Sequence, residues 1–151
     1  MDTKDPLSLW QHIHGATTHF PIALAFISAT FDAGALVFRR PNWRTVGFWT
    51  LITALVLILP AIASGLYGIY LDSGGKEKWA SDGYNHVRAI TWHRNMSFFA
   101  GGLLFVAATW RVIKHDDLTM VARIVCLLLA IAATVFVGVT GYNGAYLPLG
   151  Y

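Results

Sequence analysis

Histidine is the residue type in this sequence with the widest range of possible chemistry, since a neutral imidazole binds transition metals and moves protons near neutral pH. The chain has six histidines, and four of them form two seven-residue steps, His12 to His19 and His86 to His93. Seven residues are about two helical turns, so each pair is expected on one helix face with roughly 10 Å between its members. The pattern predicts two histidine-bearing helix faces.

The binding of a metal or of haem is the chemistry that these histidines suggest. Iron, copper and zinc all accept imidazole ligands. The sequence has no Cys-x-x-Cys-His motif, so any haem would be held without a covalent link. Arg88 and Arg94 flank the later histidines and could hold a haem propionate or a lipid phosphate. The alternative interpretation is that the histidines are hydrated, or bonded to nearby backbone.

The composition indicates that the elements carrying these histidines lie in a membrane. Of the 151 residues, 56% are hydrophobic and 13% are charged, whereas about 25% of the residues in a soluble domain are charged. The apolar residues form long uninterrupted blocks. The net charge of +3 is small, and the basic residues lie in short loops. There they report membrane topology and do not indicate nucleic-acid binding.

Four apolar segments account for most of the chain, and each has the roughly 20 residues that cross a bilayer as a helix. Backbone polar groups in lipid must be satisfied within the segment, so helix is the expected conformation. We predict an all-α protein, an integral membrane bundle of four transmembrane helices in a single domain over residues 1–151. The expected helices cover residues 13–38, 43–71, 90–113 and 118–142.

The placement of basic residues predicts the orientation of the bundle. Six of them lie in or beside the first and third connections: Arg39, Arg40, Arg44, Arg111, Lys114 and Arg123. The other five are spread over the N-terminus and the longer middle loop. Short cytoplasmic loops carry the excess of lysine and arginine. Both termini, and all the histidines except His115, are therefore expected at the outer face.

Depth in the membrane relates the histidines of the two segments to one another. The first and third segments run in the same direction, so residue order corresponds to depth in the same way in both. We expect His19 level with His93, and His14 or His12 level with His86. Facing helices lie about 8–10 Å apart, which is too close for haem between two imidazoles. For haem to bind, the two helices would therefore have to splay apart or lie diagonally across the bundle. His19 and His93 are the favoured ligands, and His14 and His86 are a reserve pair.

Other chemically active groups inside the segments are few. Asp32 is expected to pair with an arginine at the inner side of the membrane, such as Arg39, or to mark a proton route. Cys126 is expected to pack in an apolar run. The inner halves of the segments contain no histidine and no cysteine pair. Any cofactor site is therefore expected in the outer half of the bundle.

Several stretches of the sequence resemble a known bacterial family. The run from His14 through His19-Phe20-Pro21 to Leu24 is similar to the H-P-x-x-x-H-F-P-I-A-L opening of the membrane family catalogued as domain of unknown function 2231, with Gly15 in place of the usual proline. The stretch from His93 to Met96 and the ending from Thr140 to Leu147 resemble two further family motifs. The resemblance implies four helices and an association with cytochrome-type domains.

From these observations we predict a small electron-transfer subunit that spans a bacterial inner membrane several times and binds no nucleic acid. It would bind b-type haem near the periplasmic face and exchange electrons between quinone and a partner redox protein such as a cytochrome. Its expected contacts are membrane lipid, quinone and other redox subunits. Two alternatives remain open: a cofactor-free anchor or assembly subunit of a respiratory complex, and a copper- or zinc-binding membrane protein.

Overall fold

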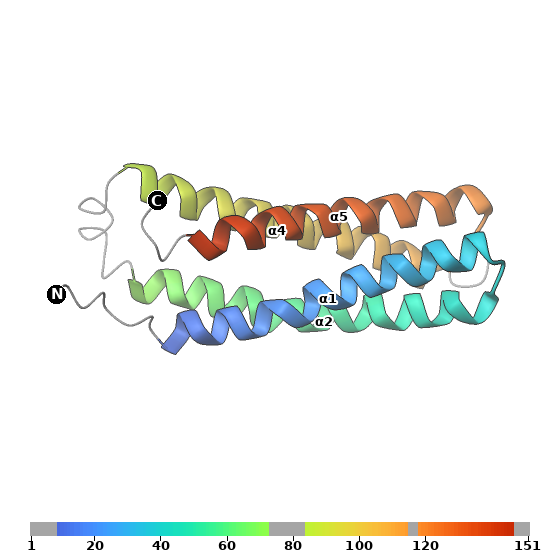
Figure 1. Ribbon diagram of the computed structural model, residues 1–151, viewed down its shortest axis with the longest axis horizontal. Helices are drawn as coiled ribbons and strands as arrows, with labels where there is room; N and C mark the ends of the chain where they lie inside the picture. Colours follow the sequence, from blue (N-terminus) through green and yellow to red (C-terminus); the bar gives the residue numbers. More distant parts are fainter. Residues whose placement is uncertain (1–8, 73–83, 115–117, 147–151) are drawn as a thin grey trace.

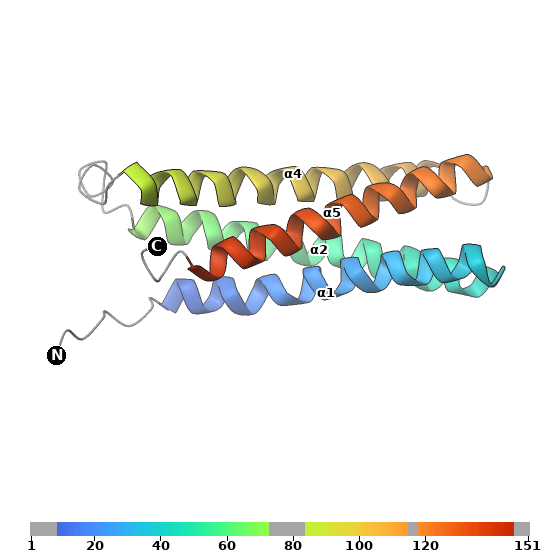
Figure 2. The ribbon, with the colours of Figure 1, turned by 45° about the horizontal axis from the view of Figure 1, so that its top comes forward.

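The computed structural model describes residues 9–72, 84–114 and 118–146, and these form four long helices. They are α1 (Leu9–Val37), α2 (Pro41–Asp72), α4 (Tyr84–Lys114) and α5 (Met120–Tyr146). Each helix is long and apolar enough to cross a membrane. Helix α1 begins and α5 ends at one end of the elongated bundle, which we call the terminal end (Figures 1 and 2). The opposite end, where α1 is followed by α2, is the hairpin end.

The prediction of four spanning helices is confirmed, and each predicted segment overlaps one helix. The helices extend beyond the apolar blocks, most of all α4, which begins at Tyr84 and not near residue 90. Its first turns contain the polar residues Asn85, His86 and Arg88, which lie before the apolar block from which the helix was predicted. Only the apolar part of a helix must match the hydrocarbon thickness, whereas its backbone hydrogen bonding continues into the polar interface.

A short turn joins α1 to α2 and fixes them as antiparallel neighbours. Arg39 adopts a left-handed backbone with φ 52°, a common way to end a helix. Pro41 is the first residue of α2, where its missing N–H would have had no helical partner. Trp43 packs against Gly34, where an added Cβ would lie 2.5 Å from a ring carbon. The absence of that Cβ lets the two helices close tightly at the hairpin end.

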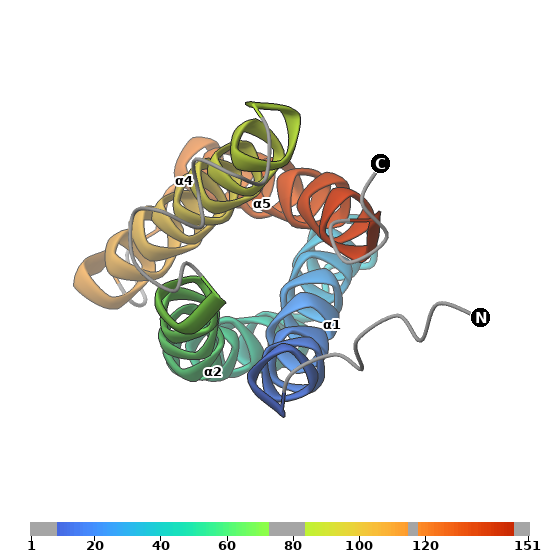
Figure 3. The ribbon, with the colours of Figure 1, turned by 90° about the vertical axis from the view of Figure 1, so that its left-hand side faces the viewer.

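Viewed from the end, the four helices surround a common axis (Figure 3). Helix α1 packs on α2 and α5, and α4 packs on the same two helices. Helices α1 and α4, which carry most of the histidines, therefore lie diagonally across the bundle. This is one of the two arrangements that the sequence left open.

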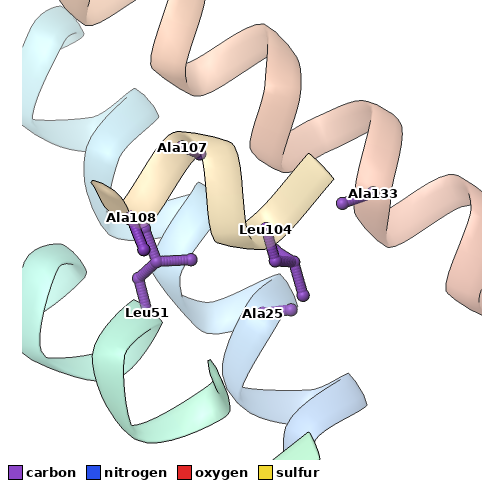
Figure 4. Close-up of a cluster of buried hydrophobic side chains, with 6 residues drawn as sticks. All are labelled: Ala25, Leu51, Leu104, Ala107, Ala108 and Ala133. Atoms are coloured by element: carbon purple, nitrogen blue, oxygen red, sulfur yellow. The ribbon is translucent and has the colours of Figure 1, made fainter. Parts of the chain in front are cut away.

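A layer of buried apolar residues, mostly alanines, lies between the helices (Figure 4). It draws on all four helices and consists of Ala25, Leu51, Leu104, Ala107, Ala108 and Ala133. Each of these side chains is at most 1% exposed. Small side chains allow spanning helices to approach closely, and this layer separates the interior of the terminal end from that of the hairpin end.

Candidate functional site

Two histidines from diagonal helices meet inside the terminal end. His14 of α1 and His93 of α4 place their ring centroids 6.3 Å apart, with the ring planes at 78° to each other. Both side chains are partly buried. Two imidazoles at this separation can act on one ligand held between them.

Helix α2 fixes the ring of His14. Its Nδ1 lies 3.0 Å from the backbone carbonyl oxygen of Ala61 and 3.3 Å from Oγ of Ser64. Gly65 lies directly behind the ring, and an added Cβ there would approach Cε1 of His14 to 2.8 Å. The small residues Ala61, Ser64 and Gly65 thus form the part of α2 that accommodates the imidazole.

Helix α5 fixes the ring of His93 in the same way. Its Nδ1 lies 3.0 Å from the backbone carbonyl oxygen of Thr140, a buried residue of α5. The hydroxyl of Ser97, one turn further along α4, donates to the carbonyl of His93 at 2.9 Å. Each histidine of the pair is therefore held by a helix other than its own, and all four helices contribute to the site.

These bonds assign the same tautomer to both rings. A carbonyl oxygen can only accept a hydrogen bond, so Nδ1 must be the donor in each case, and a neutral imidazole has a single N–H. Nε2 is then the nitrogen that keeps its lone pair. Histidines that ligate metals characteristically donate their second ring nitrogen to a backbone carbonyl or a carboxylate, which orients the ring. Both His14 and His93 bond to a backbone carbonyl in this way.

The number of protein ligands limits the kind of metal that fits. Within residues 9–72, 84–114 and 118–146, no group of three or more histidine, cysteine or acidic side chains could hold a metal ion. Zinc sites normally use at least three protein ligands, so the described residues do not form one. Haem iron needs only two axial ligands from the protein, and His14 and His93 can supply both.

The structure brings His14, and not His19, to His93. His19 is exposed, and its Nδ1 bonds to the carbonyl of Gly15 one turn earlier in the same helix. The predicted register, with His19 level with His93, is therefore wrong.

The buried positions of each helix explain this difference. On α1 they recur at seven-residue steps, at Pro21, Ser28 and Ala35. One further step back leads to His14, whereas His19 lies off this face. On α4 the same step joins His93 to the buried Ala100 and Ala107. The spacing of each histidine from the buried small residues, not from other histidines, is the signal that locates the pair.

The remaining predicted site residues lie apart from the pair or outside the described side chains. Arg88 is exposed, and Arg94 donates to the side chain of the adjacent Asn95 at 3.4 Å. Among the described contacts, neither reaches the paired rings. His86 belongs to the first turns of α4, but its side chain lies outside the described ones. His12 is exposed, and the middle loop falls largely on residues 73–83, which are also outside the described residues.

A second polar cluster occupies the hairpin end. Arg111 of α4 donates from Nη1 to Oδ2 of Asp32 at 2.5 Å and from Nη2 to Oδ1 at 3.1 Å. The same Nη2 donates to the backbone carbonyl of Arg44 at 3.1 Å, and the guanidinium carbon lies 5.5 Å from the ring centre of Phe48. The side chains of Arg111 and Asp32 are 8% and 12% exposed. This is a buried bidentate ion pair between the diagonal helices.

The predicted pairing of Asp32 with an arginine is confirmed, but the partner is Arg111 and not Arg39. Asp32 lies one seven-residue step beyond the buried Ala25, so it faces the bundle interior. Its carboxylate packs against Gly47 of α2, whose carbonyl accepts a 2.7 Å hydrogen bond from Ser28. Arg39 lies in the exposed turn after α1 and belongs to a different environment.

Comparison with known proteins gives the family of the chain. The profile of the predicted membrane proteins catalogued as domain of unknown function 2231 matches residues 11–151. The chain belongs to this family. Searches of curated proteins and of solved structures found no significant match.

Proposed function

We propose that this member of the family is a small membrane electron-transfer subunit that binds b-type haem between His14 and His93. The observation that carries the proposal is the pair itself: two imidazoles from diagonal helices, with a ring-centroid separation of 6.3 Å. The proposal retains the predicted haem chemistry and replaces His19 with His14 as the partner of His93.

The separation of the rings is suitable for a shared iron. Bonds from a transition metal to histidine nitrogen are about 2.0–2.1 Å long. Two such bonds, together with the distance of each nitrogen from its ring centre, come close to the 6.3 Å between the centroids. The diagonal position of α1 and α4 gives more width than two adjacent helices would (Figure 3). A bound haem would supply a one-electron carrier at this position.

The chain itself sets the properties of such a centre. The carbonyls of Ala61 and Thr140 accept hydrogen bonds from Nδ1 of the two rings, which leaves Nε2 of each ring as the nitrogen that would ligate. Hydroxyls of Thr17 and Ser64, which lie 3.2 Å apart, add a small polar network beside His14. Gly65 leaves the room that the His14 ring occupies. These contacts hold both ligands before any cofactor binds.

Electrons are expected to enter and leave at the terminal end. The layer that includes Ala25, Leu51 and Leu104 lies between the histidine pair and the hairpin end, and it offers no ligand group. The donor we propose is a quinol, which reaches the site from the lipid and releases two electrons and two protons on oxidation to quinone. Trp92 and Phe98 of α4 are exposed beside His93 and offer apolar surface to its ring. A partner redox protein would accept the electrons one at a time.

We further propose that the terminal end faces the periplasm in a bacterial inner membrane. The basic residues at the first and third connections support this orientation. Single cysteines at Ser8 and Asp116, in a variant in which Cys126 is replaced by alanine, can be labelled with a membrane-impermeant thiol reagent. Labelling of the Ser8 position alone in intact cells is expected, and labelling of the Asp116 position alone would reverse the orientation.

The experiment that tests the function is the absorption spectrum of the purified protein together with its metal content. Haem is expected to give a reduced-minus-oxidised difference spectrum and one iron per chain. Copper or zinc at one ion per chain, without a haem spectrum, would contradict the haem proposal and favour the metal-binding alternative. A colourless, metal-free protein, even after haem is added to the purified chain, would favour the cofactor-free anchor subunit.

A further inference from the structure

The hairpin end holds more positive than negative charge in one layer. Arg44 of α2 follows the start of its span, Pro41, by three residues, and Arg123 of α5 follows Met120 by three. Arg111 precedes the end of its span, Lys114, by three. At about 1.5 Å per residue, each of these arginines is only about 4.5 Å inside the end of its helical span. Asp32 is the acidic side chain that the described structure places among them.

Arg123 faces the interior of this layer. The buried positions of α5 follow its inner face and include Cys126, Ala130, Ala133 and Thr140. Arg123 lies one heptad before Ala130 and one turn before Cys126, so it continues this face.

Nε of Arg123 lacks a hydrogen-bond acceptor among the described residues. This nitrogen is shielded from solvent. A buried donor without an acceptor is costly, and in native structures such a group commonly marks an ion or water that completes it. The carboxylate of Asp32 is already engaged by both terminal nitrogens of Arg111. The missing acceptor must therefore come from outside the described residues.

We propose that Arg123 binds the phosphodiester group of an acidic membrane lipid at the hairpin end, beside the Asp32–Arg111 pair. A guanidinium presents planar paired donors that match the oxygens of a phosphate. The depth of the arginines places them at the boundary of the hydrocarbon, where lipid headgroups lie. Basic pockets between spanning helices bind acidic headgroups in this way. Free phosphate offers the same oxygens, but the lipid supplies them at this depth. The proposal is independent of haem binding at the terminal end.

The test compares lipids by their effect on thermal unfolding of the purified full chain in a non-ionic detergent. Phosphatidylglycerol is expected to raise the melting temperature, whereas phosphatidylcholine and inorganic phosphate at equal concentration are expected to leave it nearly unchanged. In the Arg123→Gln variant, the phosphatidylglycerol concentration needed for half the effect should rise by roughly tenfold or more. Arg40→Gln is the matched control, since it removes an equal charge from an exposed residue at the same end.

Each outcome of the comparison bears on the proposal. Equal responses of wild type and Arg123→Gln to phosphatidylglycerol would overturn it, as would an equal effect of phosphatidylcholine. An equal effect of inorganic phosphate would assign the site to a free anion and overturn the lipid source. If Arg123→Gln fails to fold, Arg123→Lys keeps the charge without the planar donors and should still show a weakened response. Native mass spectrometry of the wild type should show one acidic lipid retained per chain, and retention of none would contradict the proposal.

Discussion

The two ends of the bundle use the same construction for opposite purposes. At each end a side chain of α1 meets one of α4 across the diagonal, and α2 contributes a backbone carbonyl to the contact. At the hairpin end Asp32 and Arg111 satisfy each other with two hydrogen bonds. At the terminal end His14 and His93 bond to carbonyls of α2 and α5 and do not bond to each other. The difference is that the ion pair closes the bundle at one end, whereas at the other end Nε2 of each ring lies outside these hydrogen bonds.

The largest expected effect of a single substitution lies at the hairpin end. Arg111→Ala would leave the Asp32 carboxylate buried without its partner, and Asp32→Ala would do the same to Arg111. Breaking a buried pair in this way costs about 3–5 kcal/mol. The free energy of unfolding, measured in mixed micelles with increasing denaturing detergent, should fall by that amount for either variant.

A double variant sharpens this prediction. Asp32→Leu combined with Arg111→Met removes both charges and restores apolar volume, so it should be less destabilised than either single variant. Arg40→Ala, at an exposed position of the same end, should change the free energy of unfolding very little. Single variants as stable as Arg40→Ala would show that the ion pair does not close the bundle.

At the terminal end, Gly65→Ala should have an intermediate effect. The new Cβ would approach Cε1 of His14 to 2.8 Å and displace the ring. Forcing extra volume into a packed site typically costs about 1–3 kcal/mol, and the displaced ring should also weaken haem binding, measured by titration of haem into the apoprotein. Gly68→Ala is the matched control, since nothing lies within 4 Å of its added Cβ. The same loss of haem affinity in both variants would contradict the placement of His14.

The smallest expected effect is that of Ser64→Ala. It removes the 3.3 Å contact between Oγ of Ser64 and Nδ1 of His14 and the 3.2 Å contact between Oγ of Ser64 and Oγ1 of Thr17. It keeps the 3.0 Å bond from Nδ1 of His14 to the Ala61 carbonyl. The loss of one such hydrogen bond costs about 0.5–1.5 kcal/mol. Haem affinity should fall slightly, with the haem spectrum unchanged. Complete loss of haem would mean that Ser64, and not the carbonyl, orients the ring.

The four helices could be predicted from the sequence because a bilayer allows a spanning segment few conformations. Their ends could not, because helix hydrogen bonding continues past the apolar residues, as at Tyr84 to Arg88. The diagonal placement of α1 and α4 was one of two arrangements that the sequence left open, since splayed adjacent helices would also have given room for a haem.

The site was predicted only in part, because its pairing depends on how each helix is rotated. His14 and His93 were both among the expected ligands, but equal spacing along two helices does not determine which side chains face each other. The acceptors at Ala61 and Thr140 are backbone carbonyls, which leave no signal in side-chain type. The partner of Asp32 is Arg111, 79 residues away in the chain, and only the packing of α4 against the bundle makes that contact.

The central claim, that His14 and His93 form the haem-binding pair, is tested most directly by haem content in three single variants. His14→Ala, His93→Ala and His19→Ala would be purified in the same detergent, and the reduced-minus-oxidised spectrum of each would be compared with that of the wild type per mole of protein. The account predicts that the first two variants lose the haem spectrum and that His19→Ala retains it, since His19 is exposed and bonded within its own helix. Retention of haem by His14→Ala together with its loss in His19→Ala would contradict the account.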